Sequence, residues 1–290
     1  MLVSRAVYQR TNVKGKKMAT KIIAEIGWNF MGDMDLAKEM VKSAKRSGAD
    51  IAKFQYWNPD RLKKGAWDND GRREIYENAK LTEEKIKQLI DYCDDAKIQF
   101  LVSVFNVVDA KFVKSLGVKA IKIPSHEVAN YQLHEFVANN FDCIYVSLGA
   151  GTENEIEKAA QIYRQSADSA YVVGMHCVSS YPCPAEKANL PRLNFISDHC
   201  KRVGYSDHTS DVLTPAIALA YGVEVIEKHF TTDKNLPGRD NKFALNPAEF
   251  RDMVDNIRLA EQCLTSHGNG NLDIERDTMT SYRGRWGGND

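Results

Sequence analysis

The stretch Arg202–Phe230, RVGYSDHTSDVLTPAIALAYGVEVIEKHF, decides the fold of this 290-residue chain. Short runs rich in apolar and β-branched residues predict strands over Arg202–Ser206 and Val223–Lys228. Between them, the apolar residues of Thr214–Tyr221 fall at helical spacing. A strand, a helix and a second strand in this order predict a unit in which the two strands run parallel.

The same alternation recurs along the rest of the chain, so that eight units are counted in all. Runs that are apolar throughout indicate a parallel sheet buried on both faces. Eight units favour closure into a (β/α)₈ TIM barrel of the α/β class, and a doubly wound open sheet is the alternative. The other strands are predicted over Lys21–Ile26, Ile51–Gln55, Gln99–Val104, Ala120–Ile123, Cys143–Ser147 and Tyr171–His176, and the other helices over Leu36–Ser47, Thr82–Ala96, Ala110–Leu116, Gln132–Asn139, Glu153–Gln165, Leu190–His199 and Pro247–Leu264.

Three segments are expected along the chain. Residues 21–265 would form the catalytic barrel. Residues 1–20 are basic and contain no acidic side chain, and we interpret them as an N-terminal extension or as a hairpin that caps the barrel. Residues 266–290 are rich in glycine and are expected to form a flexible tail. The polar connection 56–80 is long for a compact domain, which is typical of a segment that covers a site.

Composition excludes several classes of protein. The 39 basic and 39 acidic residues cancel, so no general field is expected to hold nucleic acid or an anionic membrane. No apolar run approaches the roughly 18 to 20 residues of a membrane span. The six cysteines are scattered singly, which is typical of reduced thiols. We therefore expect a cytoplasmic protein that binds neither nucleic acid nor membranes.

Polar side chains gather at the carboxyl ends of the predicted strands, where (β/α)₈ barrels place their reactive groups. Lysine and serine side chains there would supply point charges and short donors for a phosphate or a carboxylate. For Lys53 or Lys122 taken alone, a snorkelling or ion-paired side chain is the alternative. The residues at these ends are Glu25, Asn29, Lys53, Gln55, Lys122, Ser125, Glu127, Ser147, His176, Ser179, Tyr181, Ser206, Asp207, His208, Glu227, Lys228 and His229.

Two of these residues, His208 and His229, lie at the ends of successive predicted strands. Two imidazoles at about this spacing can share a cation. Each histidine alone is more often a hydrogen-bonding residue, but the pair at two adjacent strand ends indicates a site for a divalent metal.

Seven segments of the chain resemble the sialic acid (N-acetylneuraminate) synthase family. The match runs in order from about Ile22 to Leu264 and thus covers the barrel domain only. Synthases of this family usually carry a small antifreeze-like C-terminal domain, which we do not expect in this chain. The matching segments are Ile22–Gly27 (IIAEIG), Gly48–Gln55 (GADIAKFQ), Lys122–Glu127 (KIPSHE), Tyr181–Pro182, Gly204–Thr209 (GYSDHT), Glu227–Thr231 (EKHFT) and Pro237–Asp240 (PGRD).

The resemblance implies a transferase that condenses phosphoenolpyruvate with the open-chain form of an N-acyl hexosamine similar to N-acetylmannosamine. The products would be a sialic-acid-like 3-deoxy-2-ulosonic acid and phosphate. The implied cofactor is a divalent metal ion, with Mn²⁺ expected first and Mg²⁺ or Co²⁺ as alternatives. The implied partners are these two small molecules, and a homodimer is considered.

The resemblance also implies roles for individual residues. Glu25, Glu127, His208 and His229 would be catalytic, the two histidines as metal ligands and the two glutamates as candidate bases. Because the antifreeze-like domain of such synthases supplies an arginine for the N-acyl group of the acceptor, we hypothesise that Arg239, Arg283 or Arg285 serves instead or that the acceptor lacks that group. Phosphoenolpyruvate would bind to Lys53, Lys122, Ser125, Ser147 and Ser206, and the sugar to Gln55, Tyr181, Asp240 and Arg239.

The chain departs from the family at two positions where histidine is common, which here hold Phe30 and Asn241. Both positions are expected on the sugar side of the site, so the acceptor is the least determined part of the reaction. Two other functions stay open. One is an aldolase or lyase on the same barrel, with Lys53 or Lys122 as a Schiff-base nucleophile. The other is a catalytically silent relative that binds a sugar.

Overall fold

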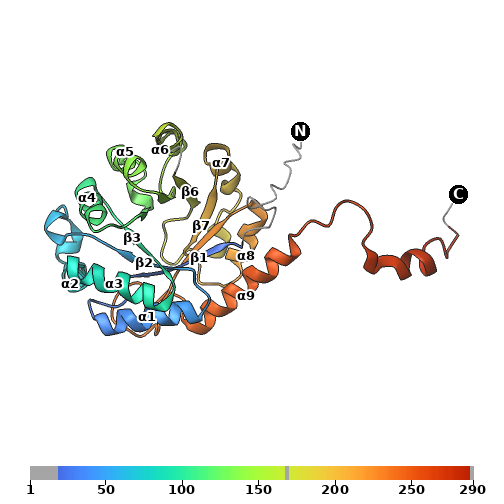
Figure 1. The fold of residues 1–290 in the computed structure, drawn as a ribbon, viewed down its shortest axis with the longest axis horizontal. Coiled ribbons are helices and arrows are strands. Elements are labelled where there is room, and N and C mark those ends of the chain that lie inside the picture. The colour runs from blue at the N-terminus through green and yellow to red at the C-terminus, as the bar shows by residue number, and fades with distance from the viewer. Residues whose placement is uncertain (1–18, 167–169, 288–290) are drawn as a thin grey trace.

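The computed structural model describes residues 19–166 and 170–287 and confirms the predicted TIM barrel (Figure 1). Eight parallel strands pair in sequence order, and β8 pairs with β1 to close the barrel. The N-terminal extension or capping hairpin expected over residues 1–20 lies outside the described residues, except for residues 19 and 20. The strands are β1 (Lys21–Gly27), β2 (Ile51–Gln55), β3 (Gln99–Ser103), β4 (Ala120–Ile123), β5 (Cys143–Ser147), β6 (Tyr171–His176), β7 (Val203–Asp207) and β8 (Val225–His229).

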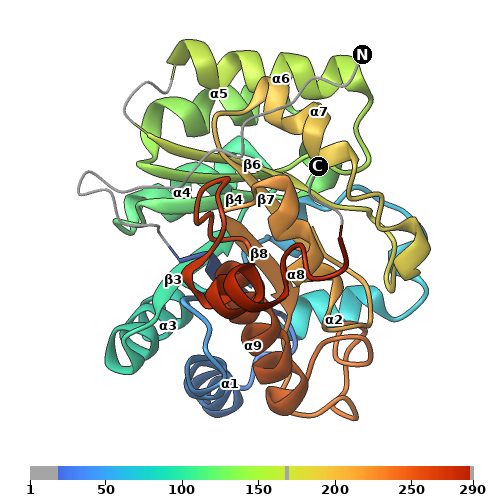
Figure 2. The same ribbon diagram turned by 90° about the vertical axis from the view of Figure 1, so that its right-hand side faces the viewer.

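The helices lie outside the ring of strands (Figures 1 and 2). Most lie within a few residues of their predicted ranges, but α2 lies in the connection 56–80, for which no helix was predicted. The helices are α1 (Met34–Arg46), α2 (Arg72–Asn78), α3 (Glu83–Ala96), α4 (Val107–Ser115), α5 (Tyr131–Asn140), α6 (Glu153–Ser166), α7 (Arg192–His199), α8 (Thr214–Ala218) and α9 (Pro247–Cys263).

Local chemistry explains where the longest of these helices begins. The side chain of Asn246 accepts hydrogen bonds from the backbone N–H groups of Ala248 and Glu249, and the Glu249 carboxylate accepts one from the Asn246 N–H. Pro247 at the first helical position has no N–H group that would need a partner. This capping box satisfies backbone donors that a helix start leaves unpaired, so α9 starts where the sequence predicts.

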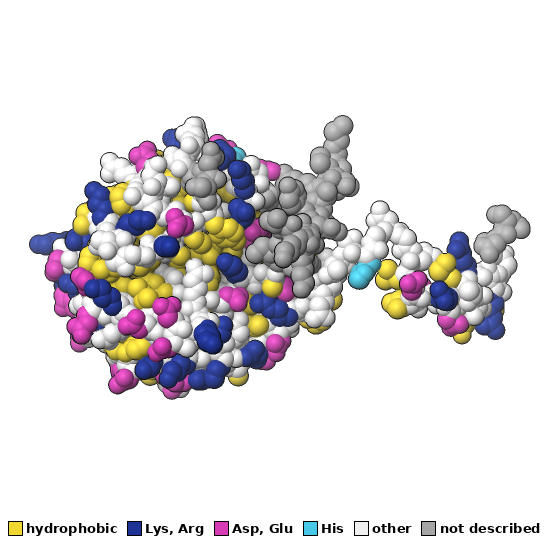
Figure 3. All heavy atoms as spheres, viewed as in Figure 1, with side chains coloured by type: hydrophobic (Ala, Val, Ile, Leu, Met, Phe, Trp, Pro, Cys, Tyr) yellow, Lys and Arg dark blue, Asp and Glu magenta, His cyan; other side chains and the backbone are white. Residues whose placement is uncertain are grey.

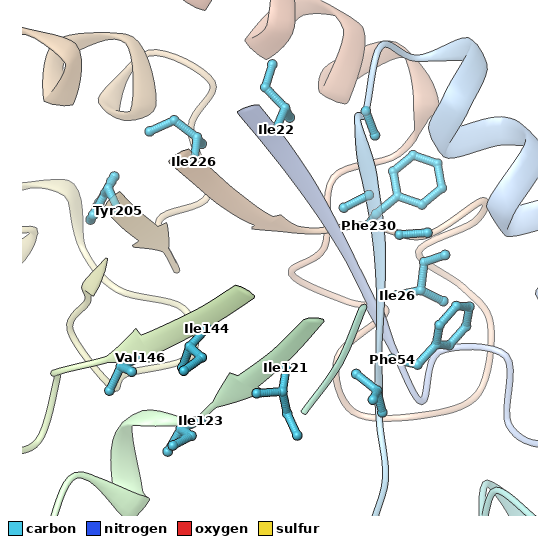
Figure 4. Packing of buried hydrophobic residues seen from close by; sticks show 14 of the residues in the cluster. Ile22, Ile26, Phe54, Ile121, Ile123, Ile144, Val146, Tyr205, Ile226 and Phe230 are labelled. Carbon is cyan, nitrogen blue, oxygen red and sulfur yellow. The ribbon is translucent and has the colours of Figure 1, made fainter. Parts of the chain in front are cut away.

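The largest buried cluster lies between the strands and the helices. Side chains that point outward from the barrel, such as Ile22, Phe54 and Ile226, are completely buried there (Figure 4). Fully burying an isoleucine or phenylalanine side chain contributes roughly 1.5–3 kcal/mol. This cluster therefore holds the helices against the barrel wall.

Inside the barrel the side chains form two layers. Because strand side chains alternate, residues two apart on one strand point to the same face. The inward-pointing residues nearer the start of the strands are mostly apolar, and we call them the lower layer. The inward-pointing residues two positions further along the strands are mostly polar, and we call them the upper layer. The lower layer contains Ile23, Ile51, Leu101, Ala120, Tyr145, Val173 and Val225, and the upper layer contains Glu25, Lys53, Ser103, Lys122, Ser147, Ser206 and Glu227 together with the apolar Met175 of β6.

Beyond α9 the described chain continues as a tail that stands off the barrel (Figures 1 and 2). It forms a short turn of 3-10 helix at Asp273–Glu275 and one of π-helix at Thr278–Tyr282. Hydrophobic and charged side chains lie together on its surface (Figure 3), and Trp286 is 91% exposed. The tail carries Arg283 and Arg285, which the structure does not bring to the end of the barrel where the upper layer lies. Within the described residues, no helix is long and apolar enough to cross a membrane.

Candidate active site

A cavity of about 360 Å³ opens at the carboxyl ends of the strands, above the upper layer. Its size is within the range of small-molecule sites. We call it the mouth cavity, and it brings together all of the predicted site residues except Glu127. Its lining consists of Glu25, Trp28, Lys53, Gln55, Tyr76, Ser103, Phe105, Lys122, Pro124, Ser125, His126, Ser147, Cys177, Tyr181, Ser206, His208, Glu227, His229, Arg239 and Asp240.

The floor of the mouth cavity contains two buried lysines with short polar partners. The Lys53 ammonium lies 2.6 Å from a Glu25 carboxylate oxygen and donates to the Ser103 hydroxyl at 3.1 Å. The Lys122 ammonium donates to the Ser147 hydroxyl at 2.7 Å. Burial lowers the pKa of Lys122, because a charge without water around it is costly. The floor thus offers two cationic donors to an anionic ligand.

One acidic residue connects the two lysines. The Glu227 carboxylate lies 3.3 Å from the Lys122 ammonium and 3.6 Å from that of Lys53, and it accepts a hydrogen bond from Ser206 at 2.9 Å. Burial raises the pKa of Glu227, but the charges of the two lysines outweigh burial and hold it at about 2. Sequence reasoning placed Glu227 at a strand end without assigning it a role. Its two-residue spacing from Val225 could have placed it in the same inward row.

Glu25 differs from Glu227 in the direction in which its pKa is shifted, although both carboxylates are buried. Burial raises the pKa of Glu25 above its ordinary value, although the neighbouring Lys53 lowers it. Glu25 also accepts a hydrogen bond from the Gln55 side-chain amide at 2.5 Å. A carboxylate with a raised pKa is a better proton acceptor than one held at about 2. Of the two, Glu25 is therefore the one suited to take up a proton.

His208 and His229 lie side by side at the edge of the mouth cavity, with ring centroids 5.7 Å apart. The Nδ1 atom of His208 lies 2.7 Å from the carbonyl oxygen of Val178, which leaves Nε2 as the free ring nitrogen. Nδ1 of His229 is buried without a hydrogen-bond partner in the described part of the chain. Burial lowers the pKa of His208 to about 4 and that of His229 well below its ordinary value, so both rings are neutral near pH 7.

Neutral imidazoles with a free ring nitrogen fit a divalent metal ion. In residues 19–166 and 170–287, no group of three or more His, Cys, Asp or Glu side chains is arranged to hold a metal. The protein would therefore supply two ligands, and water or substrate oxygens would complete the coordination. Tyr181, whose ring centroid lies 4.2 Å from that of His208, packs against this pair.

Aromatic side chains form another wall of the mouth cavity. The Trp28 ring stacks on Tyr76 of α2 with centroids 4.9 Å apart. The Trp28 indole N–H donates to the Asp240 carboxylate at 2.7 Å, and burial raises the pKa of Asp240 to about 6. Sequence reasoning predicted Asp240 and Arg239 here but missed Trp28 and Tyr76. Tyr76 lies on the helix that was not predicted, whereas Trp28 directly follows β1 and could have been noticed at that strand end.

The structure does not bring Glu127 into the mouth cavity. Its carboxylate accepts a hydrogen bond from the Asn130 side chain at 2.7 Å, and Asn130 in turn caps α5. Glu127 therefore belongs to the turn that leads into α5. Glu25 is the one of the two candidate bases that lines the cavity.

The structure places neither Phe30 nor Asn241 in the lining of the mouth cavity, although both were expected on its sugar side. Phe30 is buried and packs against Phe54, with ring centroids 5.8 Å apart. Asn241 is fully buried, and its side-chain amide donates to the carbonyl oxygens of Asn29 and Pro237. Both residues pack behind the cavity wall, so these two departures from the family act through packing.

The chain matches proteins of related sequence and structure. A model of the NeuB family matches residues 40–269. N,N'-diacetyllegionaminic acid synthase of Legionella pneumophila is 37% identical over 87% of this chain and 75% of its own length. Pseudaminic acid synthase of Campylobacter jejuni is 34% identical over 89% of this chain and 78% of its own. The crystal structure of a sialic acid synthetase from Leptospira borgpetersenii superposes with a TM-score of 0.83 at 29% identity, covering 91% of this chain and 92% of that one.

Proposed function

Because this chain belongs to the NeuB family, we propose that it joins phosphoenolpyruvate to the open-chain aldehyde form of an N-acyl hexosamine. NeuB synthases are transferases that condense phosphoenolpyruvate with a sugar, and this chain is an enzyme of that class. Its proposed products are a nine-carbon 3-deoxy-2-ulosonic acid and phosphate. The observation that carries the proposal is the arrangement of two buried lysines opposite two neutral histidines in one cavity.

The cationic floor supports binding of phosphoenolpyruvate. Lys53 and Lys122 would neutralise its phosphate and carboxylate. The hydroxyl of Ser147 accepts a hydrogen bond from Lys122, and that of Ser206 donates one to Glu227, so both hydroxyls lie on this floor. Ser125, whose hydroxyl lies 2.7 Å from that of Ser179, would add a further donor. Preorganised donors in a water-poor site stabilise charge without reorganisation.

The histidine pair supports a divalent metal, and we propose Mn²⁺, with Mg²⁺ or Co²⁺ as alternatives. A divalent ion held by His208 and His229 would supply a Lewis acid that polarises the aldehyde carbonyl. The bond between Val178 and Nδ1 of His208 directs Nε2 of that ring to the ligand.

The chain's own residues account for the remaining proton and charge movements. The C3 carbon of phosphoenolpyruvate forms a bond with the aldehyde carbon as the C2=C3 and C=O double bonds open. Water then adds to C2, and the proton that this water loses balances the one that the aldehyde oxygen gains as it becomes a hydroxyl. We propose that Glu25 accepts the proton of that water, because it is the candidate base in the cavity and burial raises its pKa. The C2–O bond to phosphate then breaks, and Lys53 and Lys122 stabilise the charge on the departing phosphate.

The acceptor wall supports a neutral sugar. Gln55, Tyr181 and Asp240 offer hydrogen-bonding groups to hydroxyls, and the stacked pair of Trp28 and Tyr76 offers an apolar face. Arg239 and the Asp240 carboxylate bring charges of opposite sign to this wall, so the wall as a whole favours a neutral ligand over a charged one. We therefore propose an N-acyl hexosamine without a phosphate group, similar to N-acetylmannosamine.

A phosphate-release assay tests the proposed function. The protein is incubated with phosphoenolpyruvate, Mn²⁺ and a panel of N-acyl hexosamines and plain aldoses, each with and without a terminal phosphate, and again with a chelator. We expect one phosphate per product, only with an unphosphorylated N-acyl hexosamine, and no release with the chelator. If no acceptor leads to phosphate release, the proposal is contradicted and a catalytically silent relative is favoured. A pyruvate or sugar adduct trapped by borohydride on Lys53 or Lys122 would favour a lyase.

A further inference from the structure

An ion pair lies directly behind the two histidines. Asp207 of β7 and Lys228 of β8 are partners in the strand register, and each immediately precedes one of the histidines in the chain. The Lys228 ammonium lies 2.5 Å from a carboxylate oxygen of Asp207, and both side chains are almost completely buried. The preceding register pair, Ser206 and Glu227, points the other way, into the mouth cavity.

The contacts of this pair hold the backbone on both sides of His208. The Asp207 carboxylate accepts hydrogen bonds from the Thr209 N–H at 2.8 Å and from the Thr209 hydroxyl at 2.9 Å. The Lys228 ammonium donates to the carbonyl oxygens of Thr209 at 2.6 Å and of Asp211 at 2.9 Å. His208 therefore sits between two residues that are both bound to Lys228, which itself adjoins His229.

A further hydrogen bond, from Tyr205, completes the contacts of the Asp207 carboxylate. The Tyr205 hydroxyl donates to the Asp207 carboxylate at 2.8 Å. The carboxylate thus has four donors, and the ammonium has an acceptor for each of its three protons. Buried charges with all their hydrogen bonds made hold a single geometry.

We propose that the ion pair between Asp207 and Lys228 is a positioning device that sets the separation of His208 and His229 and thereby the affinity for the divalent metal. The inference rests on the proposed metal site. Neither side chain lines the mouth cavity, so both are positioning residues. Partners that orient metal ligands typically contribute about 10- to 100-fold to metal affinity.

Direct titration of the protein with Mn²⁺ tests the proposal, with free Mn²⁺ followed by electron paramagnetic resonance and no substrate present. We expect the dissociation constant to rise about 10- to 100-fold in Asp207→Asn and in Lys228→Met. Thr209→Val removes only the hydroxyl contacts, so we expect a smaller rise in a variant that keeps the buried ion pair. Circular dichroism confirms that each variant is folded before titration.

A matched control comes from another buried carboxylate. Asp109 is as buried as Asp207 and pairs with Arg61, but it does not line the mouth cavity. We expect Asp109→Asn to lower the melting temperature and to leave the Mn²⁺ dissociation constant unchanged.

The outcomes separate the positioning role from the metal site itself. Wild-type affinity in folded Asp207→Asn, Lys228→Met and Thr209→Val would overturn the positioning role. Equal weakening in Asp109→Asn would also overturn it, because it would trace the effect to general loss of stability. If wild-type protein and His208→Ala bind Mn²⁺ equally, the proposed metal site fails, and the positioning role fails with it.

Discussion

The lower and upper layers of the barrel interior are built on the same strands and differ in almost every property. Ile51 and Val225 of the lower layer are apolar and completely buried. Two residues further along the same strands, Lys53 and Glu227 of the upper layer are charged and also buried. Both layers are buried, but the lower layer consists of apolar groups and the upper layer of charged and polar groups that line a cavity.

The difference shows how the barrel divides its tasks. Burying apolar side chains is favourable, whereas burying a charge is costly unless it is paired. In the upper layer, Glu25 and Glu227 are paired with Lys53 and Lys122, so that the charges compensate one another. Apolar burial below and around the barrel stabilises a fold in which these charges are held ready for an anionic ligand.

Lys122→Met has the largest expected effect, because it gives an upper-layer position the apolar character of the lower layer. Loss of a cation that stabilises departing phosphate is expected to lower kcat/KM for phosphoenolpyruvate by about 10²- to 10³-fold. Phosphate release gives the measurement. Lys119→Met, which removes an exposed lysine just before the same strand, is the control and should retain full activity.

Leu101→Ala tests the lower layer in the opposite way. Leu101 is completely buried, and a leucine truncated in a packed core typically costs about 3 kcal/mol. We expect the free energy of unfolding in urea to fall by about this amount, while the kcat of the folded enzyme changes little. A large loss of kcat at undiminished stability would contradict the division of tasks.

Trp28→Phe probes the rim above the upper layer. The change removes the indole N–H that donates to the Asp240 carboxylate but keeps an aromatic ring beside Tyr76. A hydrogen bond to a charged group is lost, so we expect the KM for the sugar to rise about 10-fold and that for phosphoenolpyruvate to stay constant. Trp67→Phe serves as the control, since Trp67 does not line the mouth cavity.

Tyr145→Phe has the smallest expected effect. Tyr145 is the one residue named in the lower layer whose side chain carries a polar group. Within the described residues, the Tyr145 hydroxyl is buried and makes no hydrogen bond of normal geometry. Its near neighbour is the Cys143 thiol, a weak hydrogen-bonding partner. Removing this hydroxyl is therefore expected to change the free energy of unfolding by at most about 1 kcal/mol, in the stabilising direction. Tyr171→Phe is the comparison, because the Tyr171 hydroxyl lies 3.5 Å from Glu224. A clear destabilisation by Tyr145→Phe would show that its hydroxyl has a partner.

Much of the barrel could be predicted because its signals are local. The apolar runs of the eight strands and the start of α9 at Pro247 depend on neighbouring residues, and the structure has both within two residues of their predicted positions. Helix α2 was missed because Arg72–Asn78 has no buried side chain and so no apolar stripe to recognise. Whether Glu127 lines the cavity could not be predicted, because a position just after a strand does not say whether a turn directs the side chain inward or toward the next helix.

The sequence by itself determined which residues end each strand, and therefore that lysines, serines and two histidines would gather at one end of the barrel. Only the tertiary structure decided how they pair. Glu227 joins Lys53 to Lys122 across β2, β4 and β8, and Asp207 meets Lys228 behind the histidines. These contacts join residues far apart in the chain, and barrel closure and the stagger of the strands set their distances.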